Sequence, residues 1–148
     1  MKKFYPISLV LFLVFIAVAM ILSGPGFGVY LSVSSLIIVV GLPLVILLAT
    51  HSPREMSSAF RAAYQSSDPV ELRASVVFFS AMQRYLLWSG VLATMVGVVA
   101  MLSVLGEKSS VGAGAALALL TVFYSIILNL TVALPFRHAA EKRLAHMA

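Results

Sequence analysis

The chain has 148 residues, the length of one ordinary domain, and 61% of them are hydrophobic while only 10% are charged. Soluble domains are about 45–50% apolar and about 25% charged, and a small chain leaves roughly 30% or more of its extended surface exposed after folding. We therefore exclude a water-soluble fold and predict an integral membrane protein, in keeping with a mean hydropathy of +1.07. The absence of cysteine excludes disulfides, thiolate metal sites and a thiol nucleophile.

Long charge-free stretches predict four transmembrane helices in an all-α protein. A hydrocarbon core of about 30 Å takes about 20 helical residues. The first stretch, Phe4 to Pro53, is long enough for two spans and is broken at Gly24-Pro25-Gly26. Two further stretches follow the polar middle of the chain. We expect spans at about residues 5–23, 29–50, 85–105 and 110–135.

The polar segment between the second and third spans, residues 52–84, contains two helix-start signals. Ser52-Pro53-Arg54-Glu55 combines a hydroxyl N-cap, a proline at the first helical position and a glutamate three residues after the cap, and Asp68-Pro69-Val70-Glu71 repeats the arrangement. We expect a short interfacial helix over 53–65, and a long helix that begins at the second signal and continues through the third span. Four residues of the long helix should face a helix bundle: Ala74, Phe78, Met82 and Tyr85.

The basic residues predict which side of the membrane the loops occupy. Cationic loops resist translocation and so remain in the cytoplasm. Nine of the ten Lys and Arg residues lie before the first span, in segment 52–84 or in the tail 137–148, and Lys108 alone lies on the other side. We therefore expect both termini and the middle segment in the cytoplasm. The net charge of +5 is explained by this topology and by lipid contact rather than by nucleic acid.

Small residues indicate which spans pack most closely. Leu gains little from burial against Leu in lipid, so tight interfaces between membrane helices favour residues that let backbones approach. The first two spans are mostly Leu, Ile, Val and Phe, and we expect them to face lipid, while the third and fourth form the packed interior. The small residues are Gly90, Thr94, Gly97 and Ala100 in the third span and Gly114, Ala118, Thr121 and Ser125 in the fourth.

Few polar side chains occur within the expected spans, and they allow two interpretations. Their hydroxyls could return hydrogen bonds to their own helices and hold neighbouring helices together, or the polar face of the fourth span could line a narrow hydrated path. The residues are Thr94 in the third span and Thr121, Tyr124, Ser125, Asn129 and Thr131 in the fourth.

No carboxylate lies within the expected spans, because Glu55, Asp68, Glu71, Glu107 and Glu141 all fall outside them. Proton and sodium relays in membranes usually need such a group. An ion-conducting complex would therefore need another subunit to supply the titrating side chain. The sequence has no zinc-protease motif, no phosphate-binding glycine-rich loop and no plausible Ser/His/Asp arrangement, so we expect neither an enzyme nor a metal or cofactor site.

Two stretches of the sequence resemble one family of membrane proteins. The first runs from Gly26-Phe27-Gly28-Val29-Tyr30 through Ser35–Gly41. The second comprises Ala93–Ser103, a short loop, and Ala116–Thr121 continuing to Leu134-Pro135. They are similar, respectively, to the second span and to the third and fourth spans of the flagellar stator subunits MotA and PomA, within the wider group that contains TolQ and ExbB.

The resemblance implies a homopentameric ring in the inner membrane of a bacterium, built around two copies of a single-span partner similar to MotB, PomB or ExbD. In that family an aspartate in the partner's helix carries the ion, H⁺ or Na⁺, and the third and fourth spans line the pore. Together with the polar and small faces, it assigns Thr94, Thr121, Tyr124 and Ser125 to the ion pathway, Gly90, Gly97, Gly114 and Ala118 to pore-helix packing, and Pro135 to the cytoplasmic exit of the fourth span.

The chain departs from the family's pattern at three places. Family members insert a large cytoplasmic domain between the second and third spans, which engages the rotor protein FliG. Here that domain is reduced to about His51–Arg84, so a direct FliG contact is not expected. Leu87 stands where the family usually has a proline, and Val122 stands where sodium-driven members have a second threonine.

These observations favour a ring subunit of an ion-driven, MotA/MotB-like, stator-type complex that couples proton or sodium entry to mechanical movement. The alternative is a non-conducting membrane scaffold or assembly subunit that keeps the same fold. The shortened middle segment favours the scaffold, whereas Thr94, Thr121 and Pro135 favour transduction. A neighbouring gene for a single-span protein with a membrane aspartate would distinguish the two.

The predicted topology can be tested with single cysteines, because the chain has none of its own. Cysteines introduced at Ser66 and Ser110 should react with a membrane-impermeant thiol reagent from opposite sides, Ser66→Cys from the cytoplasm and Ser110→Cys from the other face. Labelling of both from one side would contradict the four-span arrangement.

Overall fold

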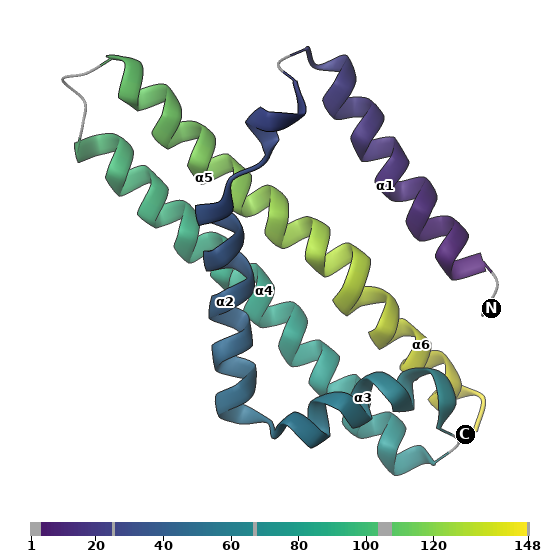
Figure 1. The fold of residues 1–148 in the computed structure, drawn as a ribbon. Coiled ribbons are helices and arrows are strands. Elements are labelled where there is room, and N and C mark those ends of the chain that lie inside the picture. Colours follow the sequence, from purple (N-terminus) through teal and green to yellow (C-terminus); the bar gives the residue numbers. More distant parts are fainter. Residues whose placement is uncertain (1–3, 25, 67, 104–107, 148) are drawn as a thin grey trace. The chain divides into compact units, whose positions relative to one another are not determined.

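Figure 1 shows the computed structural model of the chain, which describes residues 4–24, 26–66, 68–103 and 108–147. The chain divides into two units, residues 1–33 and 34–148. The first unit contains α1 (Phe4–Leu22) and a 3-10 helix, η1 (Phe27–Tyr30). The second contains nearly all of α2 (Val33–Thr50), then α3 (Pro53–Gln65), α4 (Pro69–Ser103), α5 (Lys108–Leu128), a π-helix η2 (Asn129–Ala133) and α6 (Leu134–Ala145). Every described element is helical, which confirms the all-α prediction.

The break between α1 and α2 is longer than the sequence predicted. Gly24 and Gly26 have φ angles of 88° and 81°, in a backbone region that favours glycine. The 3-10 helix follows, and Leu31 after it is extended, with φ −108° and ψ 103°. The predicted start of the second helix near residue 29 is therefore wrong, and α2 begins at Val33.

Both helix-start signals of the middle segment lie where a helix begins, but they differ in detail: the first forms the reciprocal bonds of the predicted capping box, whereas the Asp68 amide of the second donates to the Ser66 hydroxyl at 3.0 Å. The Ser52 hydroxyl accepts a hydrogen bond from the Glu55 amide at 3.3 Å, and the Glu55 carboxylate accepts one from the Ser52 amide at 3.0 Å, which completes a capping box. The Asp68 carboxylate accepts a hydrogen bond at 2.9 Å from the amide two residues later. Helix α3 accordingly begins at Pro53, and α4 begins at Pro69 and continues to Ser103.

An aromatic cluster forms the core of the second unit where α3, α4 and α6 meet. The Phe60 ring lies 4.9 Å from the Phe79 ring and 5.0 Å from the Phe136 ring, centroid to centroid, and Phe79 stacks on Phe136 at 5.2 Å. Aromatic pairs in such geometries are favourable beyond the area that they bury. The Ser75 hydroxyl donates to the Ala59 carbonyl at 2.8 Å and so joins α4 to α3 inside this core.

The buried side of α4 in this region is broader than the predicted stripe. Phe78 is buried, and Met82 and Tyr85 pack against the core, but Ala74 is exposed, so that part of the prediction is wrong. The physical reason is that α3 and α6 cover α4 from two directions, as Figure 1 shows, so two adjacent rows of side chains are buried. The additional buried residues are Leu72, Ser75 and Phe79.

Helix α2 has one buried side and one exposed side. The expectation that it would only face lipid is therefore corrected. Its buried residues recur every four positions and are Ser35, Val39, Pro43 and Leu47. The Ser89 hydroxyl of α4 lies 3.4 Å from the Val39 carbonyl, so this buried side contacts α4. Ile37 and Val45 on the opposite side are 65% and 66% exposed.

Helices α4 and α5 run antiparallel and side by side, as Figure 1 shows, and they pack closely at three glycines. A Cβ atom at Gly97 would lie 3.0 Å from both Cα and Cβ of Ala118. One at Gly114 would lie 2.8 Å from Cβ and 2.9 Å from Cα of Met101, and one at Gly90 would overlap a side chain of α5. These two helices are therefore a tightly packed pair that larger residues would separate.

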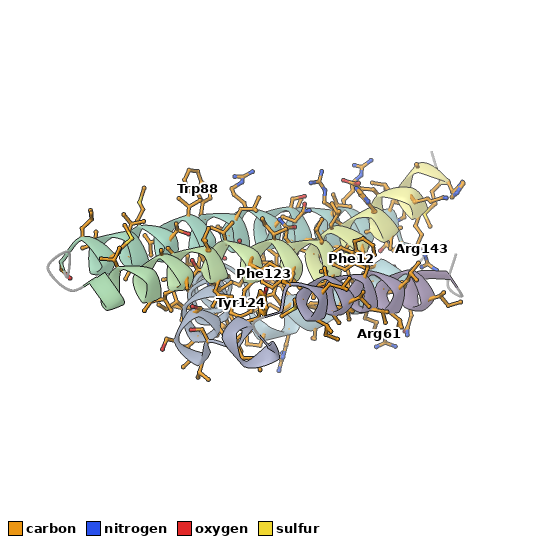
Figure 2. All side chains as sticks on the ribbon, turned by 90° about the horizontal axis from the view of Figure 1, so that it is seen from above. Phe12, Arg61, Trp88, Phe123, Tyr124 and Arg143 are labelled. Atoms are coloured by element: carbon orange, nitrogen blue, oxygen red, sulfur yellow. The ribbon has the colours of Figure 1, made fainter. Side chains whose placement is uncertain are left out.

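Three helical stretches among the described residues are long and apolar enough to cross a membrane: 33–50, 69–103 and 111–145. A shorter apolar stretch, Leu9–Leu22, lies within α1. Many large apolar side chains of these helices are exposed, as expected for a surface that meets lipid. Trp88 on α4 is exposed as well and points away from its neighbours in Figure 2, an orientation typical of aromatic side chains near a membrane interface.

The close approach of α4 and α5 predicts opposite effects for two glycines of the same helix. Gly114→Ala should lower the free energy of unfolding by about 1–3 kcal/mol, because its new methyl group meets the Met101 backbone. Gly112→Ala should leave stability unchanged or raise it slightly, because no atom lies within 4 Å of the added group. Unfolding in mixed detergent micelles would measure both, and equal effects would contradict the glycine contact.

Candidate functional site

Two threonine hydroxyls meet at the interface of α4 and α5. The Oγ1 atoms of Thr94 and Thr121 lie 3.1 Å apart, within hydrogen-bond distance. The Thr94 hydroxyl lies 2.7 Å from the Gly90 carbonyl and 3.3 Å from the Ala118 carbonyl, and the Thr121 hydroxyl donates to the Ala118 carbonyl at 2.7 Å. Thr121 is 1% exposed and Thr94 is half-buried. The pair is therefore a connected polar site in which Thr94 is partly accessible and Thr121 is buried.

Ser125 lies one turn further along α5, against Gly90. Its hydroxyl donates to the Val122 carbonyl at 3.2 Å, and its Cβ lies 2.7 Å from the place that a Cβ of Gly90 would occupy. Ser125 can be buried at this point because Gly90 has no side chain. Tyr124 precedes it and is half-buried, with its ring centroid 6.1 Å from that of Phe123 (Figure 2).

The hydroxyls in this region bond to their own helices, as one of the two interpretations of the polar residues expected. The pattern holds for Thr94, Thr121, Ser125 and Thr131, each of which has a backbone carbonyl three or four residues earlier within 3.2 Å of its hydroxyl oxygen. The contact between the two threonines adds a link across helices to this pattern. Among the described residues no buried side-chain nitrogen or oxygen lacks a partner.

Pro135 lies inside a continuous helical run, whereas the sequence placed it in the last turn of a span. It is the second residue of α6, which begins directly after the π-helix η2, and the run extends to Ala145. A proline has no amide hydrogen for the carbonyl four residues earlier, which disrupts the regular α-helical ladder. The amide of Leu134 instead donates to the Asn129 carbonyl, five residues back, which is the π-helical pattern.

A polar network that the sequence did not reveal joins α4 to the π-helix and α6. The Gln83 amide nitrogen donates to Asn129 Oδ1 at 3.2 Å, and the Gln83 amide oxygen accepts from Arg137 Nη1 at 2.8 Å. Arg137 Nε also pairs with Glu141 at 2.7 Å. Gln83 thus uses both ends of its amide to link two segments that lie about fifty residues further along the chain. Asn129 was noted in the sequence as polar, but nothing in the spacing indicated its partner.

The described residues contain no group of three or more His, Asp or Glu side chains placed to hold a metal ion. No Asp or Glu occurs between residues 72 and 106 or between 108 and 140. The site of α4 and α5 can therefore donate and accept hydrogen bonds, but its own side chains cannot carry a proton between carboxylates.

The sequence profile of the MotA/TolQ/ExbB proton channel family matches residues 33–148. The match covers more than half of the chain, and the protein therefore belongs to this family. It is a family of membrane-embedded proteins, not a known enzyme family, and its members work in complexes with a single-span partner of the MotB or ExbD type. A comparison with curated proteins found no match.

The matched range begins at the first residue of α2 and includes both threonines, Gln83 and the π-helix. The resemblance stated from the sequence is therefore confirmed at the level of this wider family. Its first part, Gly26–Tyr30, lies outside the matched range.

The Gln83 network predicts that Arg137 cannot be replaced by lysine. A lysine ammonium is a compact point charge that cannot reproduce two bonds in different directions, so Arg137→Lys should lower the free energy of unfolding by about 1–2 kcal/mol. The matched control is Arg84→Lys at the exposed position beside Gln83, which should change stability by less than about 0.5 kcal/mol. Equal stability of the two variants in detergent unfolding would show that the network contributes nothing.

Proposed function

We propose that this protein is the ring subunit of an ion-driven energy-transducing complex of the MotA/MotB type. In this proposal five copies surround the membrane helices of a single-span partner, and proton or sodium entry drives mechanical movement. Membership of the proton channel family supports the proposal, and the threonine pair between α4 and α5 is the observation that carries it. The complex lies in the bacterial inner membrane with both termini in the cytoplasm.

The chemistry of the threonine pair suits a partner that brings its own carboxyl group. A hydroxyl has one proton and two acceptor lone pairs. Thr121 gives its single proton to the Ala118 carbonyl at 2.7 Å, and Thr94 gives its own to the Gly90 carbonyl at 2.7 Å or to Thr121 Oγ1 at 3.1 Å, which leaves lone pairs of the Thr94 oxygen as acceptors. Such an acceptor can take the proton of a neutral aspartic acid or replace one water molecule around a cation. We propose that the partner's aspartate supplies the group that α4 and α5 lack.

The two threonines have different roles in this proposal because their exposure differs. Thr94 is half-buried and meets the partner or the ion, whereas Thr121 is 1% exposed and orients the Thr94 hydroxyl. Tyr124 and Ser125 continue the polar path along α5. Pro135 gives the helix its irregular turn at the cytoplasmic exit.

Direct torque on FliG is not part of the proposal. The segment between the second and third membrane helices consists of α3 and the first turns of α4, and α3 packs against α4 and α6. Val122 removes the second hydroxyl that a sodium site would use, so the ion, H⁺ or Na⁺, is tested directly by ion substitution.

The proposal is tested with threonine-to-valine variants in proteoliposomes that contain the chain and its single-span partner. Valine keeps the shape and removes the hydroxyl, so Thr94→Val should reduce ion flux about tenfold or more, as expected for a lost hydrogen bond to a charged group of about 1.5–3 kcal/mol. Thr121→Val should have a smaller effect. Assembly of the ring should be unchanged in both variants.

A control variant and an ion substitution complete the test. Thr50→Val removes a hydroxyl at the end of α2 that also donates to its own helix, and flux should remain at the wild-type level. Replacing sodium with potassium at constant pH distinguishes sodium from proton flow. Full flux in the double variant Thr94→Val, Thr121→Val would contradict the role of the hydroxyls, and absence of any flux in the wild type would favour a non-conducting scaffold.

A further inference from the structure

A cavity of about 320 Å³ lies between α3 and the beginning of α4, on the second unit. We call it the α3–α4 groove. Its floor is apolar and is formed by the small, buried side chains of Ala59 and Ala62. Phe78 lies at one end of the groove, and its ring contacts the His51 ring edge-on, with the centroids 5.3 Å apart. The groove is lined by His51, Glu55, Ser58, Ala59, Ala62, Glu71, Ala74, Val77 and Phe78.

The rim of the α3–α4 groove is acidic although the chain is basic overall. Glu55 and Glu71 are two of the five acidic residues of the chain, and both line this cavity. The ion pair found among the described residues, Arg137 with Glu141, involves neither of them. Arg61 on α3 does not line the cavity. It bonds to Gln65 at 3.3 Å, and Figure 2 shows it pointing outward.

Apolar side chains are exposed beside this acidic rim. Val70 and Val77 are 73% and 64% exposed, and Ala74 between them is exposed too. These three residues occupy one face of α4 at helical spacing, in the charged stretch before the expected membrane span. The surface therefore combines an apolar edge, a hollow floor and two carboxylates.

We propose that the α3–α4 groove binds a lysine- or arginine-bearing segment next to the membrane helix of the single-span partner. The inference rests on the proposed function, which supplies such a partner. A single-span protein with a cytoplasmic end carries basic residues beside its helix, because cationic flanks stay in the cytoplasm. The aliphatic stem of a lysine or arginine would lie over the alanine floor and Phe78, and its charged end would reach Glu55 or Glu71.

The size of the groove indicates an anchor rather than a large interface. A cavity of about 320 Å³ accommodates one or two long side chains and not a whole helix. Binding of this kind would hold the partner's flank without burying its helix, and its strength would depend on ionic strength because both carboxylates are exposed.

The first test places a larger side chain on the lining of the groove and has a closely matched control. Ser57 and Ser58 are adjacent and exposed, and each hydroxyl donates to the carbonyl three residues earlier at 2.9 Å. Only Ser58 lines the groove. Ser58→Leu should weaken binding of a labelled peptide of lysines interrupted by single leucines about tenfold, while Ser57→Leu should change it less than about twofold. The full chain is used in nanodiscs of zwitterionic lipid, with empty nanodiscs as the baseline.

The second test removes the charge without disturbing the helix caps. Glutamine replaces glutamate in a capping box, so Glu55→Gln keeps the start of α3. The double variant Glu55→Gln, Glu71→Gln should weaken peptide binding about fivefold or more and abolish most of its salt dependence. Asp68→Asn is the control, because asparagine also caps helices and the residue lies outside the groove.

The outcomes separate this inference from the proposed function. Peptide binding is measured without ion flow, so loss of binding in the groove variants supports the groove even if threonine replacement leaves flux unchanged. Equal binding by wild type and both groove variants would overturn it. Equally strong binding of a peptide in which glutamate replaces every lysine would also overturn it. If the groove variants instead changed the oligomer mass, the groove would belong to a neighbouring copy of the chain, and the proposal would be wrong.

Discussion

The close approach of α4 and α5 is the constraint on which the remaining structure depends. Their backbones meet through Gly90, Gly97 and Gly114, each of which faces an atom that a side chain would displace. This contact brings Thr94 and Thr121 within 3.1 Å of each other. Membrane helices gain little from apolar burial, so such contacts and the hydrogen bonds that they allow supply much of the specificity. A wider spacing would separate the hydroxyls and leave α5 without a fixed register on α4.

Much of the fold follows from local sequence signals that have a direct physical cause. The capping box at Ser52 and Glu55 predicted the start of α3, and the break at Gly24 and Gly26 predicted the separation of the first two helices. Among the small residues noted in the sequence, Gly90, Gly97 and Gly114 lie where α4 and α5 meet, whereas Ala100 is exposed. The predicted start of α2 was four residues too early, because the 3-10 turn after the glycines has no distinctive residue composition that would mark it in the sequence.

The parts that could not be predicted depend on contacts between distant segments. Gln83 is an ordinary polar residue in the sequence, and its importance appears only when Arg137 and Asn129 are brought to it. Ala74 fitted a buried stripe by spacing, yet the aromatic core shifted the burial toward Phe79 and Leu72. The groove beside Glu55 and Glu71 likewise requires two helices to be placed side by side. Periodicity reports which face of one helix is apolar, and it does not report how many neighbours cover that face.

The π-helix at Asn129–Ala133 changes the rotational phase of the helical rod that runs through α5 and α6. Arg137 follows Ser125 by twelve residues, and a regular α-helix would point the two about 120° apart around its axis. A π turn accommodates one extra residue, which reduces this difference to about 20°. Ser125 and Arg137 can therefore both face α4, where they meet Gly90 and Gln83. Helix α4 can therefore contact both α5 and α6, although the π-helix interrupts the regular repeat between them.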